Sequence, residues 1–325
     1  MPNLNSIEIK KRAIELYKLL DPCQICPRLC RAKRLHGAAG FCQVLDKAIL
    51  SSALAHFGEE PPITGRGGSG TIFLSSCNAA CIFCQNYQIS HERIGNPVSI
   101  SQLANEYLHL QAVGCENINW VTPTPHLPFL VDALASAVEQ GLKIPVVYNT
   151  NGYDRVEVLR LLDGIVDIYL PDMKYGEDVW AEEYSGLKNY FTINVAAIKE
   201  MYRQVGLLII NEKGVAVKGL LVRHLVLPNG RAGSARLFRA LAKIDPQVPV
   251  SLMAQYHPCY QAVGHPVLGR RISRDEYLKA LEDFENAGLL NAFTQDYISL
   301  EHEDFFFPDF NDNERVFNHR NNREK

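Results

Sequence analysis

The chain has 325 residues, of which 47% are hydrophobic and 21% charged, so it can bury a full core as one large α/β domain or as a domain with an appendage. A net charge of −3 at pH 7 provides no positive surface for a nucleic-acid backbone, which excludes nucleic acid as an expected partner. No apolar run approaches the roughly 18 residues of a membrane span and residues 1–12 lack the apolar core of a signal peptide, so we expect a cytoplasmic protein without a membrane partner.

The first predicted element is a helix over residues 5–20, which Asp21-Pro22 ends. Asn5 or Ser6 is placed to cap its first turn. One face of the helix carries apolar residues at helical spacing, namely Ile9, Ala13, Leu16 and Leu20.

Four cysteines follow this helix within twenty residues: Cys23, Cys26, Cys30 and Cys42. Gly37 and Gly40 permit tight turns that bring amide N–H groups toward thiolate sulfur, as zinc knuckles and iron–sulfur loops require. Four thiols at such short separations are hard to explain as ordinary packing and make a closed set of ligands. The sequence therefore predicts a second metal centre here, with zinc and an iron–sulfur cluster both open.

Residues 59–68 are polar, contain two prolines and end in glycines, so they are expected to be a linker. The predicted division is a cysteine-rich segment with this linker over residues 1–64, a main domain over 65–290, and a C-terminal extension over 291–325. In the extension, residues 305–307 and Phe310 form an aromatic group that is expected to cover the main domain. The last fifteen residues are expected to be mobile.

Six strand–helix units are predicted along the main domain, together with a small hairpin over residues 207–217 that precedes the fifth unit. The strands and their helices are 71–74 with 101–111, 117–121 with 128–139, 145–148 with 155–162, 165–170 with 196–203, 219–227 with 232–243, and 249–254 with a helix that a capping box at 273–276 begins. Regular β/α alternation requires right-handed crossovers and a mainly parallel sheet. The predicted class is therefore α/β, as a complete or partial barrel.

The first of these strands leads into a loop with three cysteines in CxxxCxxC spacing, Cys77, Cys81 and Cys84. Three thiolates are too few to close a tetrahedral metal site, so they predict a metal centre with one position free for a ligand. In the alternative reading, the chain is a redox or zinc-binding adaptor, and His91 is the fourth ligand of a zinc ion.

The other predicted strands also end in polar residues. In barrels of this kind the chemistry lies at the C-terminal ends of the strands, so these side chains are expected around one cavity. The strand ends are Thr122 to His126, Asn149 to Gly152, Asp172 to Lys174, Arg223 with His224, and Gln255 to Cys259.

These motifs carry a resemblance to a known family. The CxxxCxxC loop, with the aromatic Phe83 just before its third cysteine, is similar to the radical S-adenosylmethionine (SAM) superfamily. Three strand-end motifs look like the pyruvate formate-lyase activating enzyme group: Asp172-x-Lys174, Asn149-Thr150-Asn151-Gly152 and Arg223-x-Leu225-Val226-Leu227-Pro228. Two others resemble its PflX-like branch: Cys23-x-x-Cys26-Pro27-Arg28-x-Cys30 and Gly70-Thr71-Ile72-Phe73. The resemblance extends to about residue 290.

The resemblance implies a partial barrel of the (β/α)6 TIM type with a small N-terminal cysteine-rich helical segment, holding a 4Fe–4S cluster on Cys77, Cys81 and Cys84. It also implies that SAM binds the open iron and is cleaved reductively to a 5′-deoxyadenosyl radical. That radical would abstract hydrogen from a protein or peptide, as a glycyl-radical-activating enzyme does, with a small-molecule substrate as the alternative. An electron donor of the flavodoxin or ferredoxin type is the partner that this chemistry implies.

The same resemblance assigns contacts with SAM to single residues. Phe83 would lie near the adenine, and Asp172 and Lys174 would contact the ribose and the carboxylate of SAM. Arg223 would add charge-assisted hydrogen bonds. Asn149 and Asn151, from the strand-end turn, are expected at the same ligand.

One motif departs from the family pattern. Where the family usually has Gly-Gly-Glu-Pro after the second strand, this chain has Thr122-Pro123-Thr124-Pro125. The glutamate that would receive the SAM ammonium group is missing, so the hydroxyls of Thr122 and Thr124 or nearby carbonyls are expected to take its place.

Overall fold

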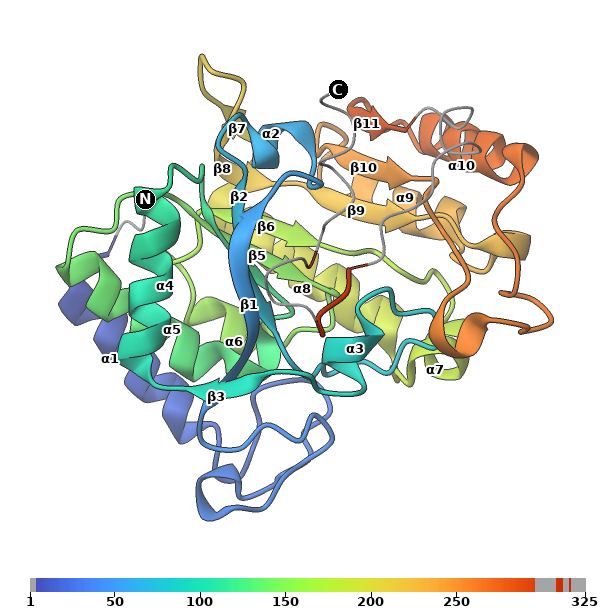
Figure 1. Ribbon diagram of the computed structural model, residues 1–325. Helices are drawn as coiled ribbons and strands as arrows, with labels where there is room; N and C mark the ends of the chain where they lie inside the picture. The colour runs from blue at the N-terminus through green and yellow to red at the C-terminus, as the bar shows by residue number, and fades with distance from the viewer. Residues whose placement is uncertain (1–3, 296–307, 312–315, 317–325) are drawn as a thin grey trace, which may run out of the picture.

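A curved run of parallel strands forms the centre of the computed structural model, which describes residues 4–295, 308–311 and 316 (Figure 1). Five strands lie side by side in the order β2 (Ser69–Leu74), β4 (Ile118–Val121), β5 (Val146–Thr150), β6 (Ile168–Pro171) and β8 (Ala216–Leu220). After Leu221, β8 continues as β9 (Val222–Leu225), which pairs in parallel with β10 (Val250–Met253). A bridge between Asp172 and Arg223 joins the end of β6 to β9. The predicted α/β class and the partial six-stranded barrel are confirmed.

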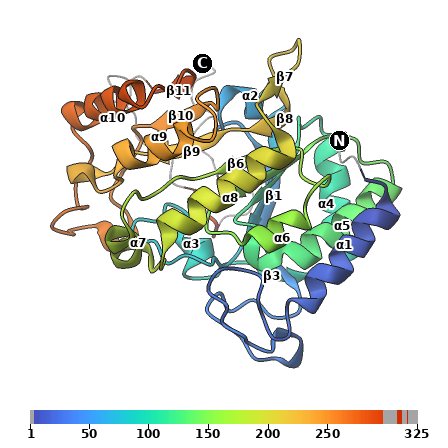
Figure 2. The ribbon, with the colours of Figure 1, turned by 180° about the vertical axis from the view of Figure 1, so that it is seen from behind.

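Helices cover the outer face of this sheet, as Figure 2 shows from behind. They are α4 (Ile100–Ala112), α5 (Leu127–Glu139), α6 (Val156–Arg160), α8 (Tyr190–Val205), α9 (Ser234–Ala242) and α10 (Arg274–Asn286). The predicted capping box is present, because the Ser273 side chain accepts from the Glu276 amide and the Glu276 side chain accepts from the Ser273 amide. The fourth unit differs from its prediction, since a further helix, α7 (Asp178–Ser185), precedes α8. Gly186 ends α7 in the left-handed conformation that suits glycine.

The N-terminal helix α1 (Ser6–Lys18) packs on α5. The Tyr17 and Phe129 rings meet edge to face with centroids 5.5 Å apart, and Lys10 pairs with Asp132. Asn5 is the N-cap, as one of the two predicted alternatives has it. The interior face of α1 is therefore buried against the barrel's own helix layer.

Residues 48–64 contribute to the barrel as well. Strand β1 (Ala48–His56), which was not predicted, pairs antiparallel with β2, and β3 (Asn96–Val98) pairs with β1. The residues expected to form a linker include a short helix, α2 (Pro61–Thr64), and both Glu60 and Ile63 are buried. The division at residue 64 stays a prediction, but the sheet runs across it.

The remaining elements are short. The predicted hairpin is present as β7 (Ile209–Ile210) paired antiparallel with β8, and β11 (Ala292–Thr294) extends the sheet beyond β10. One turn of helix follows the cysteine loop at α3 (Tyr87–Ser90). Single 3-10 turns occur at η1 (Arg34–His36), η2 (Thr124–His126), η3 (Pro228–Gly230) and η4 (Tyr260–Ala262). Among the described residues, no helix combines the length and the apolar character that crossing a membrane requires.

Phe310 covers the inner face of the sheet. Its ring lies 5.2 Å from that of Phe73 and clusters with Val121, and it is almost fully buried. Because successive side chains of a strand face opposite sides, Phe73 and Val121 point into the barrel while Ile72 and Trp120 face the helices. The predicted aromatic cover is confirmed for Phe310. Residues 305–307 and, apart from 311 and 316, the last fifteen residues lie outside the described part of the chain.

Replacing Phe310 by alanine is expected to lower the free energy of unfolding by about 1.5–3 kcal/mol, the value of burying one phenylalanine side chain. Urea unfolding followed by circular dichroism measures this change. Val113→Ala is the matched control, because Val113 is 56% exposed at the end of α4 and should be nearly neutral. An equal effect of both substitutions would show that Phe310 contributes no packing energy.

Candidate functional site

The cysteine loop leaves β2 and is fixed by backbone hydrogen bonds on both sides. Ser76, with φ of 76°, adopts the left-handed conformation and donates its amide to the Ile89 carbonyl over 2.7 Å. Further along, the Ala80 amide donates to the Ser185 carbonyl over 2.9 Å, at the end of α7. The loop is therefore held between α3 and α7, and the direction of its thiols follows from these contacts.

Each sulfur of the loop has its own hydrogen-bonding group. These are the Ala79 amide (3.3 Å) and the Asn151 side-chain amide (3.4 Å) at Cys77, the Ser185 hydroxyl at Cys81 (3.0 Å), and the Ser90 hydroxyl at Cys84 (3.1 Å). Donors of this kind stabilise thiolates that bind a metal and tune its redox properties. The donor set thus fits a cluster held by three cysteines.

The surroundings of Cys77 and Cys84 favour the neutral form of their thiols. Burial and then the neighbouring thiol of Cys81 raise the pKa of Cys77 to about 12, and the same two causes raise the pKa of Cys84 to about 11. A metal centre reverses this preference, because it stabilises thiolates directly. Among the residues described, no group of three or more His, Cys, Asp or Glu side chains is arranged to hold a single metal ion.

His91 has a different role from the one it has in the zinc alternative. Its Nε2 lies 3.0 Å from the carbonyl oxygen of Cys81, and its ring stacks on Tyr260 with centroids 4.6 Å apart. The ring nitrogen that faces the loop is therefore bonded to the backbone of the loop. This contact supports the loop and leaves the thiol set at three.

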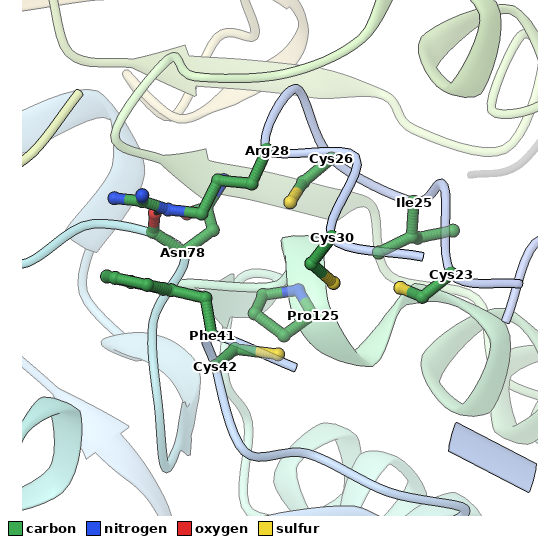
Figure 3. Close-up of a pocket in the computed structure, with 9 residues that line it drawn as sticks. All are labelled: Cys23, Ile25, Cys26, Arg28, Cys30, Phe41, Cys42, Asn78 and Pro125. Atoms are coloured by element: carbon green, nitrogen blue, oxygen red, sulfur yellow. Dashed lines mark hydrogen bonds between the residues drawn. The ribbon is translucent and has the colours of Figure 1, made fainter. Parts of the chain in front are cut away.

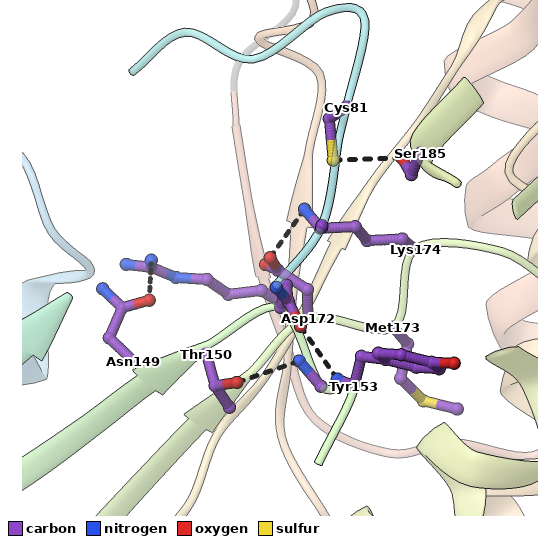
Figure 4. A network of polar contacts seen from close by, with 12 residues as sticks. Cys81, Asn149, Thr150, Tyr153, Asp172, Met173, Lys174 and Ser185 are labelled. Carbon is purple, nitrogen blue, oxygen red and sulfur yellow. Dashed lines mark hydrogen bonds and ion pairs between the residues drawn. The ribbon is translucent and has the colours of Figure 1, made fainter. Parts of the chain in front are cut away.

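Asp172 and Lys174 form an ion pair at the end of β6, with Nζ and Oδ2 2.7 Å apart (Figure 4). Both side chains are about one-fifth exposed, so the pair is accessible to a small ligand. Burial opposes the charge on Lys174, but the attraction of Asp172 and of the Cys81 thiolate outweighs it and raises the pKa of the ammonium group. Lys174 therefore stays positively charged beside the cysteine loop.

Arg223 is held by the carboxylates of Glu59 and Glu60, two residues of the predicted linker. Its Nε lies 2.7 Å from Glu60 Oε1 and its Nη2 2.6 Å from Glu60 Oε2, and Glu59 pairs with the same guanidinium. The Nη1 group donates to Asn149 Oδ1 over 3.3 Å. Direct contact of Arg223 and Asn149 with SAM stays a prediction, while the observed partners lock both side chains in place. The adjacent acidic pair before Pro61-Pro62 is the signal that could have revealed this cluster.

Thr124 has a buried side chain that is bound within the protein. Its hydroxyl is buried and donates to Asp154 Oδ1 over 2.8 Å, and the same carboxylate accepts from Tyr148 (3.0 Å) and Thr150 (2.7 Å). Burial nevertheless raises the pKa of Asp154. Asp154 is not among the predicted site residues, and its place four residues after Thr150 is the only signal in the sequence that could have revealed it. Of the two threonines predicted at the SAM ammonium group, only Thr122 keeps a partly exposed side chain.

Two further predicted residues line the cysteine loop. Asn151 donates to Asn78 Oδ1 over 2.8 Å as well as to the Cys77 sulfur, so it binds the loop directly. The Phe83 ring is buried, with its centroid 5.6 Å from that of Tyr256, and its carbonyl accepts from the Cys259 thiol over 3.2 Å. The end of β10 therefore packs on the loop, as the barrel geometry predicts. The roles of Asn151 and Phe83 toward SAM stay predictions.

The four N-terminal cysteines come together at one cavity beside this site. Figure 3 shows Cys23, Cys26, Cys30 and Cys42 around it, with Asn78 of the cysteine loop and Pro125 of η2 in its wall. Residues from three separate parts of the chain thus meet at this point.

The amino-acid sequence of the chain is similar to a known family and to a curated protein. The family model described as "Radical SAM superfamily" matches residues 71–206, from β2 to the end of α8. An uncharacterised protein of Methanocaldococcus jannaschii is 34% identical over 299 residues, which cover 89% of this chain and 80% of that protein.

Solved structures with a similar arrangement share little sequence with this chain. A radical SAM methyltransferase from Sphaerobacter thermophilus has a TM-score of 0.48 at 15% identity, over 69% of this chain and 65% of that one. Streptococcus suis SuiB bound to precursor peptide SuiA has a TM-score of 0.44 at 14% identity, over 68% and 47%. HydG, a maturase of the FeFe-hydrogenase, has a TM-score of 0.44 at 10% identity, over 70% and 51%. The chain spans less than two thirds of the length of each of these structures.

The family match begins at β2, the strand that leads into the CxxxCxxC loop, and covers the ends of β4, β5 and β6. It implies a 4Fe–4S cluster and SAM as cofactors, and the hydrogen-bonded thiols of Cys77, Cys81 and Cys84 fit that cluster. The chain belongs to the radical SAM superfamily of enzymes.

Proposed function

We propose that the protein cleaves SAM reductively and uses the 5′-deoxyadenosyl radical to abstract hydrogen from a protein or peptide, as a glycyl-radical-activating enzyme does. One observation carries the SAM chemistry: the charged Asp172–Lys174 pair lies beside the three-cysteine loop at the same edge of the barrel. The activating-enzyme type and the PflX-like branch are supported by the strand-end and N-terminal motifs.

The residues at the strand ends have separate tasks in this proposal. Cys77, Cys81 and Cys84 would hold a cluster able to supply the one electron that cleaves the C–S bond of SAM, which gives methionine and the 5′-deoxyadenosyl radical. Lys174 binds the carboxylate of SAM through its ammonium group, and Asp172 accepts a hydrogen bond from the ribose. Thr122, with its partly exposed side chain, and the carbonyls of its loop receive the SAM ammonium group. The buried Phe83 lies beside the adenine and keeps water from the loop.

The proposal includes a partner and a compartment. An electron donor of the flavodoxin or ferredoxin type provides the reducing equivalent. The nine cysteines are all free thiols in the structure, which fits the reducing cytoplasm, where thiols persist.

Anaerobic reconstitution with iron and sulfide, followed by SAM and a strong reductant, tests the proposed chemistry. We expect 5′-deoxyadenosine in amounts that depend on both SAM and reductant, measured by liquid chromatography. A cluster whose spectrum responds to SAM but yields no 5′-deoxyadenosine would contradict the catalytic claim. A mass change or a radical signal in a candidate protein partner supports the activating type, whereas turnover of a small molecule alone would replace it.

Replacing Ser185 by alanine is expected to lower the reduction potential of the bound cluster. The Ser185 hydroxyl donates to Cys81 and is itself oriented by the Tyr175 hydroxyl, 2.6 Å away. This hydrogen bond stabilises the more negative, reduced state of the cluster. Losing a bond worth about 0.5–1.5 kcal/mol therefore lowers the one-electron reduction potential by roughly 20–65 mV. Potentiometric titration followed by electron paramagnetic resonance measures the shift. Ser136→Ala on the outer helix α5 should leave the potential unchanged, and equal potentials in all three proteins would refute the role.

A further inference from the structure

We propose that the N-terminal cysteines bind a second metal centre with four thiolate ligands. Nearby arginines balance the negative charge of this centre, and the centre stabilises the loops around the SAM site. Its ligands are Cys23, Cys26, Cys30 and Cys42. This centre is distinct from the one on the CxxxCxxC loop and goes beyond the proposed function.

The four thiols surround one cavity from two sides (Figure 3). Cys23 and Cys26 are buried, whereas Cys30 is exposed and Cys42 is partly exposed. In the described chain, no three of these thiols are arranged to hold a single ion. Binding of one metal centre by all four therefore requires the two outer cysteines to move toward the two buried ones.

The backbone of this segment is shaped around the thiols. Leu29 and Arg31, on either side of Cys30, have φ of 45° and 55°, in the left-handed region that side chains rarely adopt. Gly40 packs directly on Cys30, because a Cβ atom there would lie 2.4 Å from the Cys30 sulfur. A side chain at position 40 would therefore force the Cys30 thiol out of its observed place at the cavity.

Arg34 is the strongest sign of a missing negative charge. Its side chain is fully buried, and it donates to the carbonyls of Pro125 over 2.9 Å and Leu45 over 3.2 Å. Its Nη1 also lies 4.0 Å from the Cys23 sulfur. Within the described residues, no carboxylate forms an ion pair with it. A buried cation without a counter-ion is unfavourable, and a metal bound by four thiolates is an anionic group that supplies one.

Arg28 connects the same cavity to the catalytic loop. Its guanidinium lies 3.4 Å from the centre of the Phe41 ring and donates to the carbonyls of Asn78 (2.5 Å) and Gly186 (2.7 Å). Asn78 follows Cys77 directly and receives the Asn151 hydrogen bond. Together with the Arg34 bond to Pro125, these contacts tie the second centre to two loops of the SAM site. Metal at the N-terminal cysteines thus stabilises the geometry of both loops.

Zinc and an iron–sulfur cluster share this tetrathiolate chemistry, and metal analysis separates them. The test uses the full chain with Cys77, Cys81 and Cys84 replaced by alanine, loaded anaerobically with iron and sulfide or with zinc. We expect either about four irons and four sulfides per chain or about one zinc. Either result supports the centre and names its metal, provided that further replacement of Cys23 and Cys26 by serine removes it. A variant that folds by circular dichroism yet binds neither metal would overturn the proposal.

The rate at which a chelator removes the second metal tests the role of the Arg34 charge, and this measurement does not depend on enzyme activity. Arg34→Met should release the second metal at least tenfold faster than the parent triple variant, while Arg34→Lys keeps most of the stability because it keeps the charge. Gly40→Ala should also speed release, since it displaces Cys30. Cys115→Ala is the matched control, a buried cysteine outside both sets, and should have no effect. Unchanged release in both Arg34→Met and Gly40→Ala would refute the assigned roles.

Discussion

Alanine at Cys77, Cys81 and Cys84 is expected to lower 5′-deoxyadenosine formation by more than about 100-fold, to the background of a protein-free reaction. Residues that support the ligands of a metal site without binding the metal are worth about 10–100-fold, and here all three predicted ligands are removed. Each of the three sulfurs has a hydrogen-bonding group in the structure that fits a thiolate ligand. Product analysis under anaerobic, SAM-saturated conditions measures the loss.

Two controls make this result specific. Cys115→Ala removes a buried thiol outside both cysteine sets and should keep full activity. Metal analysis of the triple variant shows whether the N-terminal centre survives, so loss of activity can be separated from loss of all iron. Activity that persists in a triple variant would mean that SAM is not cleaved at this loop.

Replacing Arg223 by methionine is expected to lower the free energy of unfolding by about 3–5 kcal/mol at neutral pH, because it leaves buried carboxylates without their cation. The side chains of Arg223, Glu59 and Glu60 are only 14%, 9% and 7% exposed. Burial opposes the charged form of Glu60, but the attraction of Arg223 outweighs it and holds the pKa of that carboxyl below its usual value. Urea unfolding of the wild type and the variant measures the difference.

The pH dependence follows from the direction of that shift. Because the pKa of Glu60 is lower in the folded state, its contribution to stability is complete above the unfolded value near 4.5 and is lost as the pH falls through the folded value. Without Arg223, burial raises the pKa of the same carboxyl, so the variant gains stability when the carboxyl is protonated. The difference between the two proteins should be largest near pH 7 and shrink below about pH 4.5.

A compensating variant separates charge from packing. Combining Arg223→Met with Glu59→Gln and Glu60→Gln removes the unpaired charges, and it should recover much of the lost stability near pH 7. No recovery, together with a difference that does not depend on pH, would contradict the ion-pair explanation. The same variants should bind SAM more weakly, because Arg223 also orients Asn149 at the end of β5.

The architecture and the positions of the predicted cluster ligands are local properties of the sequence. Alternating apolar strands and amphipathic helices determine a parallel β/α arrangement through chain geometry alone, and the six strands were found for that reason. The spacing of Cys77, Cys81 and Cys84 on one short loop likewise indicates a three-thiolate centre without knowledge of any distant residue. Strand β1 was missed, because its pairing with β2 decides its structure more than its own residues do.

The partners of the polar side chains were decided only by tertiary structure. Arg223 pairs with Glu60, 163 residues away, and Thr124 turns to Asp154, which no spacing in the sequence connects to it. Buried polar groups take the partners that folding brings within reach, because leaving them unsatisfied is unfavourable. For that reason the cysteine spacing alone predicts the chemistry proposed for this barrel, whereas packing controls which side chains are exposed at the site and which ones are bound within the protein.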